Sequence, residues 1–199
     1  MRLPLGSRTS RRSKHRLKPA QRGGSSRSRA GRPLRIETLE NRVVLDSTVV
    51  FNEVMYNPPG IDTDDSLEWI ELYNQLAVNM DVSEWELEGG VDFTFADQTV
   101  VPGRGHLLVV PFDPDSQPAE LAAFLAEYDV PVDVEIVGPY LDQLDNGGEE
   151  LRLVNNDNRL MNVLDYGDGG DWPVAPDGSG ATLAKRDPTL ASEPAENWT

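Results

Sequence analysis

Most of the side chains in this sequence that are suited to chemistry lie in short acidic loops. Asp165, Asp168 and Asp171 recur at intervals of three in a Gly-rich loop, and further acidic groups occur at 62–65 and 142–150. Hard cations such as Ca²⁺ need several oxygen ligands at once, which clustered carboxylates provide, but none of these groups has EF-hand spacing. We expect a mainly solvated acidic surface. A weak calcium site at Asp165, Asp168 and Asp171 is the alternative.

Paired carboxylates are the second candidate for chemistry. Two carboxyl side chains can hydrolyse a glycosidic bond when a cleft holds them on either side of it and raises one pKa. Glu53 with Glu68 or Glu71 is such a pair. Because a half-buried strand usually presents its Glu residues to solvent, we do not expect catalysis there.

Histidine and cysteine offer little further chemistry. The chain has no cysteine, which excludes disulfides, thiolate nucleophiles and Cys-ligated metals. Of its two histidines, His15 lies in a basic segment, and His106 has no partner motif and is interpreted as structural. The sequence therefore predicts a protein that is not an enzyme and that carries no cofactor, apart from the weak calcium hypothesis.

Tryptophan side chains are candidates for binding rather than for catalysis. Trp69 and Trp85 lie in strand-like segments and are expected in the core. Trp172 follows the Gly-rich acidic loop and precedes a proline, so we expect it to be partly exposed, as a platform for a sugar or a protein. Trp198 lies near the end of the chain, and its sequence context does not indicate a role for it.

Charge divides the chain into two parts of opposite sign. Residues 1–35 contain 12 of the 18 Lys and Arg residues and none of the 34 acidic residues, so this segment carries +12. The remaining 164 residues have 6 basic and 34 acidic side chains and carry −28. The net charge of −16 describes neither part.

The basic segment 1–35 is rich in Arg, Ser and Gly, with scattered single apolar residues, and is predicted to be disordered. We interpret it as a targeting or export segment, although it has no apolar run of secretory-signal type. A spacer is another reading. A third is nucleic-acid binding, in which the basic side chains contact phosphates. No apolar stretch is long enough for a membrane-spanning helix.

A short linear element follows the basic segment at 36–47. Its residues Leu39, Glu40, Arg42 and Leu45 resemble the LEPR-XLL element near the N-terminus of exported planctomycete proteins, with Asn41 in place of the proline. The resemblance implies a targeting role and an exported or cell-surface location. A short amphipathic element that packs on the following domain is the alternative.

Beyond residue 48 the sequence changes to short strand-like runs separated by turn residues. One helix is predicted over 118–128, because Leu121, Phe124, Leu125 and Tyr128 share one face and Pro118 suits a first turn. Ser116 or Gln117 is expected as its cap. Composition and spacing indicate an all-β sandwich or barrel. Strands are predicted at 49–56, 68–74, 85–88, 93–95, 107–110, 133–137, 150–154 and 160–166.

Ordered motifs along this region resemble the bacterial lamin tail domain. They include Glu53-Val54-Met55-Tyr56-Asn57-Pro58, Glu68-Trp69-Ile70-Glu71-Leu72-Tyr73-Asn74, Val101-Pro102-Gly103 and Leu144-Asp145-Asn146-Gly147-Gly148. The resemblance implies an immunoglobulin-like β-sandwich with one short helix. It also implies an accessory or adhesion role in exported proteins.

We therefore divide the chain into a basic leader (1–35), the linear element (36–47), a lamin-tail-like sandwich (48–187) and a C-terminal extension (188–199), for which truncation is one interpretation. The predicted function is that of a non-catalytic binding or structural module of an exported or cell-surface bacterial protein. Its partner is expected to be a protein or a surface polymer. The alternative is a cytoplasmic, nucleic-acid-associated protein that binds through the basic segment.

Overall fold

The computed structural model describes residues 48–59 and 67–199. The basic segment and the linear element, with Leu39, Glu40, Arg42 and Leu45, lie outside these residues, and so does the acidic group at 62–65. Within the described residues, no helix combines the length and the apolar character needed to cross a membrane.

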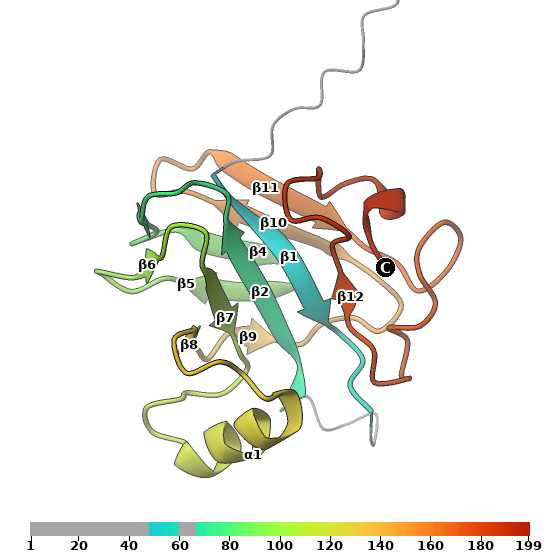
Figure 1. The fold of residues 1–199 in the computed structure, drawn as a ribbon, viewed down its shortest axis with the longest axis horizontal. Coiled ribbons are helices and arrows are strands. Elements are labelled where there is room, and N and C mark those ends of the chain that lie inside the picture. The colour runs from blue at the N-terminus through green and yellow to red at the C-terminus, as the bar shows by residue number, and fades with distance from the viewer. Residues whose placement is uncertain (1–47, 60–66) are drawn as a thin grey trace, which may run out of the picture. The chain divides into compact units, whose positions relative to one another are not determined.

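Two five-stranded sheets form the body of the domain (Figure 1). The first sheet has the strand order β12-β1-β2-β7-β8, and the second has the order β11-β10-β4-β5-β9. The first contains β12 (Leu183–Ala184), β1 (Val49–Met55), β2 (Trp69–Asn74), β7 (His106–Val109) and β8 (Glu135–Val137). The second contains β11 (Leu160–Asp165), β10 (Glu150–Val154), β4 (Glu86–Gly89), β5 (Val91–Thr94) and β9 (Leu141–Asp142). A small pair joins β3 (Met80–Asp81) to β6 (Val100–Val101).

The inner faces of the two sheets pack against each other and form the main core. Side chains alternate between the two faces of a strand, so Ile70 and Leu72 of β2 point inward while Trp69 and Glu71 point outward. Ile70 and Leu72 are fully buried in one cluster with Leu151 and Leu153 of the second sheet. At about 25 cal/mol per Å² of apolar surface, this burial is the main force that holds the sheets together.

Helix α1 (Pro118–Tyr128) covers part of the outer face of the first sheet. It lies between β7 and β8, which pair in parallel and therefore need a crossover connection. Phe124 is fully buried against Trp69 and Leu108, in a second apolar cluster separate from the main core. Figure 1 shows the helix at one end of the sandwich, so the other end of the same outer face is left without a helix.

Residues 188–199, which we set apart as a C-terminal extension, pack onto the sandwich. Trp198 is fully buried in the main core cluster, and its Nε1 donates to the carbonyl oxygen of Ser192 at 2.8 Å. The backbone of Thr199 pairs with that of Ala184 in β12. A turn of 3-10 helix, η2 (Ala195–Asn197), immediately precedes the buried Trp198.

The prediction of an all-β sandwich with one short helix is confirmed. The helix begins and ends where its apolar spacing and Pro118 indicate, and Gln117 occupies the N-cap position. All eight predicted strands exist, with ends displaced by two residues at most. The two-residue strands β3, β6, β9 and β12 were not predicted, because segments of that length carry no alternation pattern.

Replacement of Trp198 by Ala should lower the free energy of unfolding by about 3–5 kcal/mol, because it empties a fully buried site and removes a buried hydrogen bond. Chemical denaturation of the full chain measures this change. Val174→Ala, at a side chain that is 71% exposed, is the matched control and should have little effect. Equal stability of the two variants would show that residues 188–199 do not support the fold.

Candidate functional site

Two glutamates lie opposite each other on the outer face of the first sheet. Glu53 of β1 is the cross-strand partner of Glu71 of β2. A bulge at Asn52 shifts the register of β1 and brings Glu53 opposite Glu71. Like charges at directly opposed positions destabilise a sheet, so this pair needs compensation from its neighbours.

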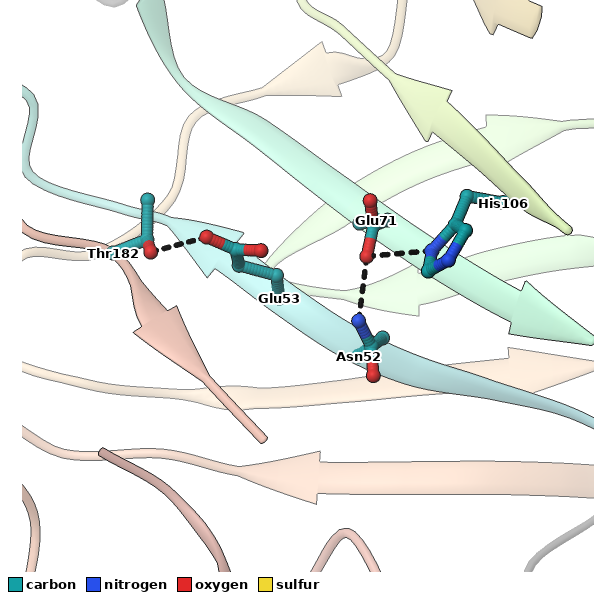
Figure 2. A network of polar contacts seen from close by, with 5 residues as sticks. All are labelled: Asn52, Glu53, Glu71, His106 and Thr182. Carbon is teal, nitrogen blue, oxygen red and sulfur yellow. Dashed lines mark hydrogen bonds and ion pairs between the residues drawn. The ribbon is translucent and has the colours of Figure 1, made fainter. Parts of the chain in front are cut away.

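Three neighbours provide that compensation, and together with the two glutamates they form what we call the outer-face cluster (Figure 2). Asn52 Nδ2 donates to Glu71 Oε1 at 2.6 Å, and the Thr182 hydroxyl donates to Glu53. His106 Nδ1 lies 2.9 Å from Glu71 Oε1, an ion pair when the imidazole is protonated, though not a well-aligned hydrogen bond. No Lys or Arg in the described part of the chain forms an ion pair with either glutamate.

The electrostatics of the cluster favour a positive charge. Burial raises the pKa of Glu53, and the neighbouring Glu71 carboxylate raises it further, against the lowering effect of the hydrogen bond from Thr182. The polar contact with Glu71 raises the pKa of His106 against the opposing effect of burial. Burial is the main cause of the shift at Glu53, and the contact with the Glu71 carboxylate is the main cause of the shift at His106.

A cavity of about 240 Å³ adjoins this cluster, between the first sheet and α1. We call it the α1 cavity. Glu53, Glu71 and Thr182 line one side. The other lining residues are aromatic and aliphatic: Trp69 and Leu108, which share the outer face of the sheet with Glu71, and Phe124, Tyr128, Val130, Pro131 and Val134 from α1 and the loop after it. The site is therefore an apolar pocket with two carboxylates on one wall.

The loop after α1 gives this cavity an apolar rim. Val132, between the lining residues Pro131 and Val134, is fully exposed. Leu125 of the helix does not line the cavity and is 40% exposed, although apolar spacing predicted it on the buried face. The Tyr128 hydroxyl donates to the Leu67 carbonyl oxygen at 2.8 Å and holds the end of the helix near the start of β2. Burial raises the pKa of Tyr128 to about 12, so it stays neutral and acts as a donor.

The geometry of Glu53 and Glu71 suits binding better than hydrolysis. The two carboxyl groups of a glycosidase lie on either side of the bond that breaks. Here both glutamates project from adjacent strands of one sheet, on the same wall of the cavity.

Glu68, the other glutamate considered for that pair, lies apart from the cavity and has a structural role. It is 2% exposed and accepts hydrogen bonds from the Tyr140 hydroxyl and the Leu144 backbone N–H, both at 3.0 Å. These bonds attach the segment after β8 to the start of β2.

The three aspartates of the calcium hypothesis are not brought together. Asp165, Asp168 and Asp171 are exposed, and within residues 48–59 and 67–199 no group of three or more acidic or histidine side chains is arranged to hold a metal ion. The loop geometry therefore offers no cage of carboxylates at these positions.

Trp172, the expected contact residue, is half-buried. It packs against the main core, and its ring centroid lies 6.3 Å from that of Trp198. The aromatic side chains at the α1 cavity are Trp69, Phe124 and Tyr128, which sequence reasoning assigned to core packing. The α1 cavity could have been recognised only from the pairing register of β1 and β2, which places Glu53 opposite Glu71.

Comparison with known proteins supports one family. Residues 46–168 match the family model described as Lamin Tail Domain, which is a family of non-catalytic, immunoglobulin-like domains. The match covers both glutamates and the whole of α1. No curated protein matches the chain.

The outer-face cluster should make stability depend on pH. Because the pKa of His106 is higher in the folded state, its ion pair stabilises the fold fully below its ordinary pKa of about 6.5, and this contribution is lost as the pH rises through the raised value. The wild type should thus lose stability relative to His106→Gln between about pH 6 and 8. Denaturant unfolding across that range measures the difference.

The Glu71→Gln background is the control for this measurement. Without the Glu71 carboxylate, this loss of stability with rising pH relative to His106→Gln should disappear, because burial is then the larger remaining effect on His106 and lowers its pKa. A difference between wild type and His106→Gln that stays constant with pH would contradict the ion pair.

Proposed function

Because the chain belongs to the lamin tail domain family, we propose that it is a non-catalytic module that makes contacts with a protein or a surface polymer. We further propose that it acts as part of an exported or cell-surface bacterial protein. The observation that carries the proposal is the α1 cavity, an apolar pocket with a carboxylate wall and an exposed apolar rim. Concave, mostly apolar sites with a few polar groups are typical of binding sites.

The rest of the described surface is consistent with a contact module. The main core is closed and apolar, so the sandwich serves as a rigid support for the groups on its outer faces. The sequence after residue 35 carries −28, which keeps such a module soluble and favours basic partners over polyanions.

Export is proposed from the sequence alone. The +12 segment precedes the LEPR-XLL-like element at 36–47, and this order is typical of exported proteins that carry the element. The alternative location is the cytoplasm, where the same 12 basic side chains would contact nucleic-acid phosphates. The charge of −28 beyond residue 35 opposes that alternative, because it repels a polyanion.

Fractionation of the producing cells, followed by mass spectrometry of both chain ends, tests the proposal. We expect the protein in the surface or medium fraction, with N-terminal peptides that begin near residues 36–48. A cytoplasmic protein with an intact N-terminus would contradict export. Nucleic-acid binding that falls steeply with salt would then support the alternative.

A further inference from the structure

We propose that the α1 cavity binds a single Lys or Arg side chain, flanked by apolar residues, in an extended peptide segment of a partner protein. This inference rests on the proposed binding role and adds the chemistry of the partner. It does not depend on export, so the two proposals fail separately.

The charge of the cavity wall is the first argument. Glu53 and Glu71 are opposed like charges, and the only charged partner that the described residues provide is His106, which is protonated only in part of the pH range. Glu71 is 15% exposed at its side chain, so its charge is poorly screened by water. A permanent cation at this wall would relieve the repulsion by Glu71, which adds to the effect of burial in raising the pKa of Glu53.

On the outer face of the second sheet, a similar group of carboxylates is neutralised by a basic side chain of the protein itself. There Glu86, Glu88 and Asp92 line a groove that also contains Arg152, whose Nη2 donates to Glu88 Oε2 at 2.6 Å. That acidic groove has its own guanidinium group. Within the described residues the α1 cavity has no Lys or Arg in its lining, and the charged partner of its carboxylates is the titratable His106, so a partner protein can supply a permanent cation.

The remaining walls suit the rest of a basic side chain. Lys and Arg bury their methylene stems against apolar surface, and aromatic faces attract the cationic head. Tyr128, which is half-buried, and the small exposed part of Trp69 provide such surfaces beside Glu53 and Glu71.

Size and rim favour one side chain in a peptide over a larger ligand. Pockets for drug-sized molecules begin at about 300 Å³, and this cavity is smaller, at about 240 Å³. Val132, fully exposed between the lining residues Pro131 and Val134, would contact an apolar residue next to the basic one. A bare metal ion is disfavoured, because no group of three acidic or histidine side chains that could hold one occurs within the described ranges.

The test uses the full chain, labelled with ¹⁵N, and two synthetic tripeptide amides. One is N-acetyl-Leu-Arg-Leu, and the other has citrulline, an uncharged isostere, in place of arginine. Titrations at about pH 8, above the ordinary pKa of His106, follow the indole N–H signal of Trp69, which Trp69→Phe identifies. We expect the arginine peptide to shift this signal and the citrulline peptide to bind at least about tenfold more weakly.

Matched double variants locate the interaction. Glu53→Gln/Glu71→Gln keeps the size of both side chains, removes the repulsion and should weaken binding of the arginine peptide by about tenfold or more. Glu86→Gln/Asp92→Asn removes the same charge from the opposite sheet and should leave the affinity within about twofold. Thermal unfolding verifies that both variants are folded.

Four results would overturn the inference. They are no shift of the Trp69 signal with the arginine peptide, equal affinity for the citrulline peptide, unchanged affinity in Glu53→Gln/Glu71→Gln, and equal weakening in the two double variants. Trp69 shifts that depend on protein concentration without any peptide would instead assign the cavity to a second copy of the chain. None of these results bears on whether the protein is exported.

Discussion

The packing of the two inner sheet faces is the constraint on which the rest of this structure depends. Once Ile70 and Leu72 are buried against Leu151 and Leu153, the period of two along β2 leaves Trp69 and Glu71 no choice but the outer face. Helix α1 covers the apolar part of that face, at Trp69, and leaves the polar part open. The α1 cavity is the boundary between these parts, so the site is a consequence of how the core is built.

The cost of placing Glu53 opposite Glu71 is met locally, by Asn52, Thr182 and His106. These three residues come from separate segments of the chain, and Thr182 lies 129 residues from Glu53. The segment that ends the chain contributes in a similar way, because Trp198 completes the core beside β12. Parts of the sequence with little local pattern thus support the surface that we propose to bind.

Lamin tail domains are non-catalytic, and the geometry of this chain gives a physical reading of that property. Its carboxylates share one wall, and its buried Glu68 is committed to the Tyr140 hydroxyl and the Leu144 N–H. Charge on a rigid apolar support is a means of recognition, since it selects a partner of opposite sign and excludes one of like sign. Recognition by charge is consistent with the non-catalytic family, with the charge of −28 beyond residue 35 and with the carboxylates of the α1 cavity.

The sequence by itself determined the fold class, the eight longer strands and the helix, because apolar period, turn residues and Pro118 are local signals. It also determined that cysteine chemistry is excluded, and it identified Glu53, Glu71 and His106 as residues to examine. Only the tertiary structure decided which of these meet, because the bulge at Asn52 sets the register. It likewise decided that Trp198 lies in the core and that Asp165, Asp168 and Asp171 do not converge, since contacts between residues far apart in the chain leave no trace in local spacing.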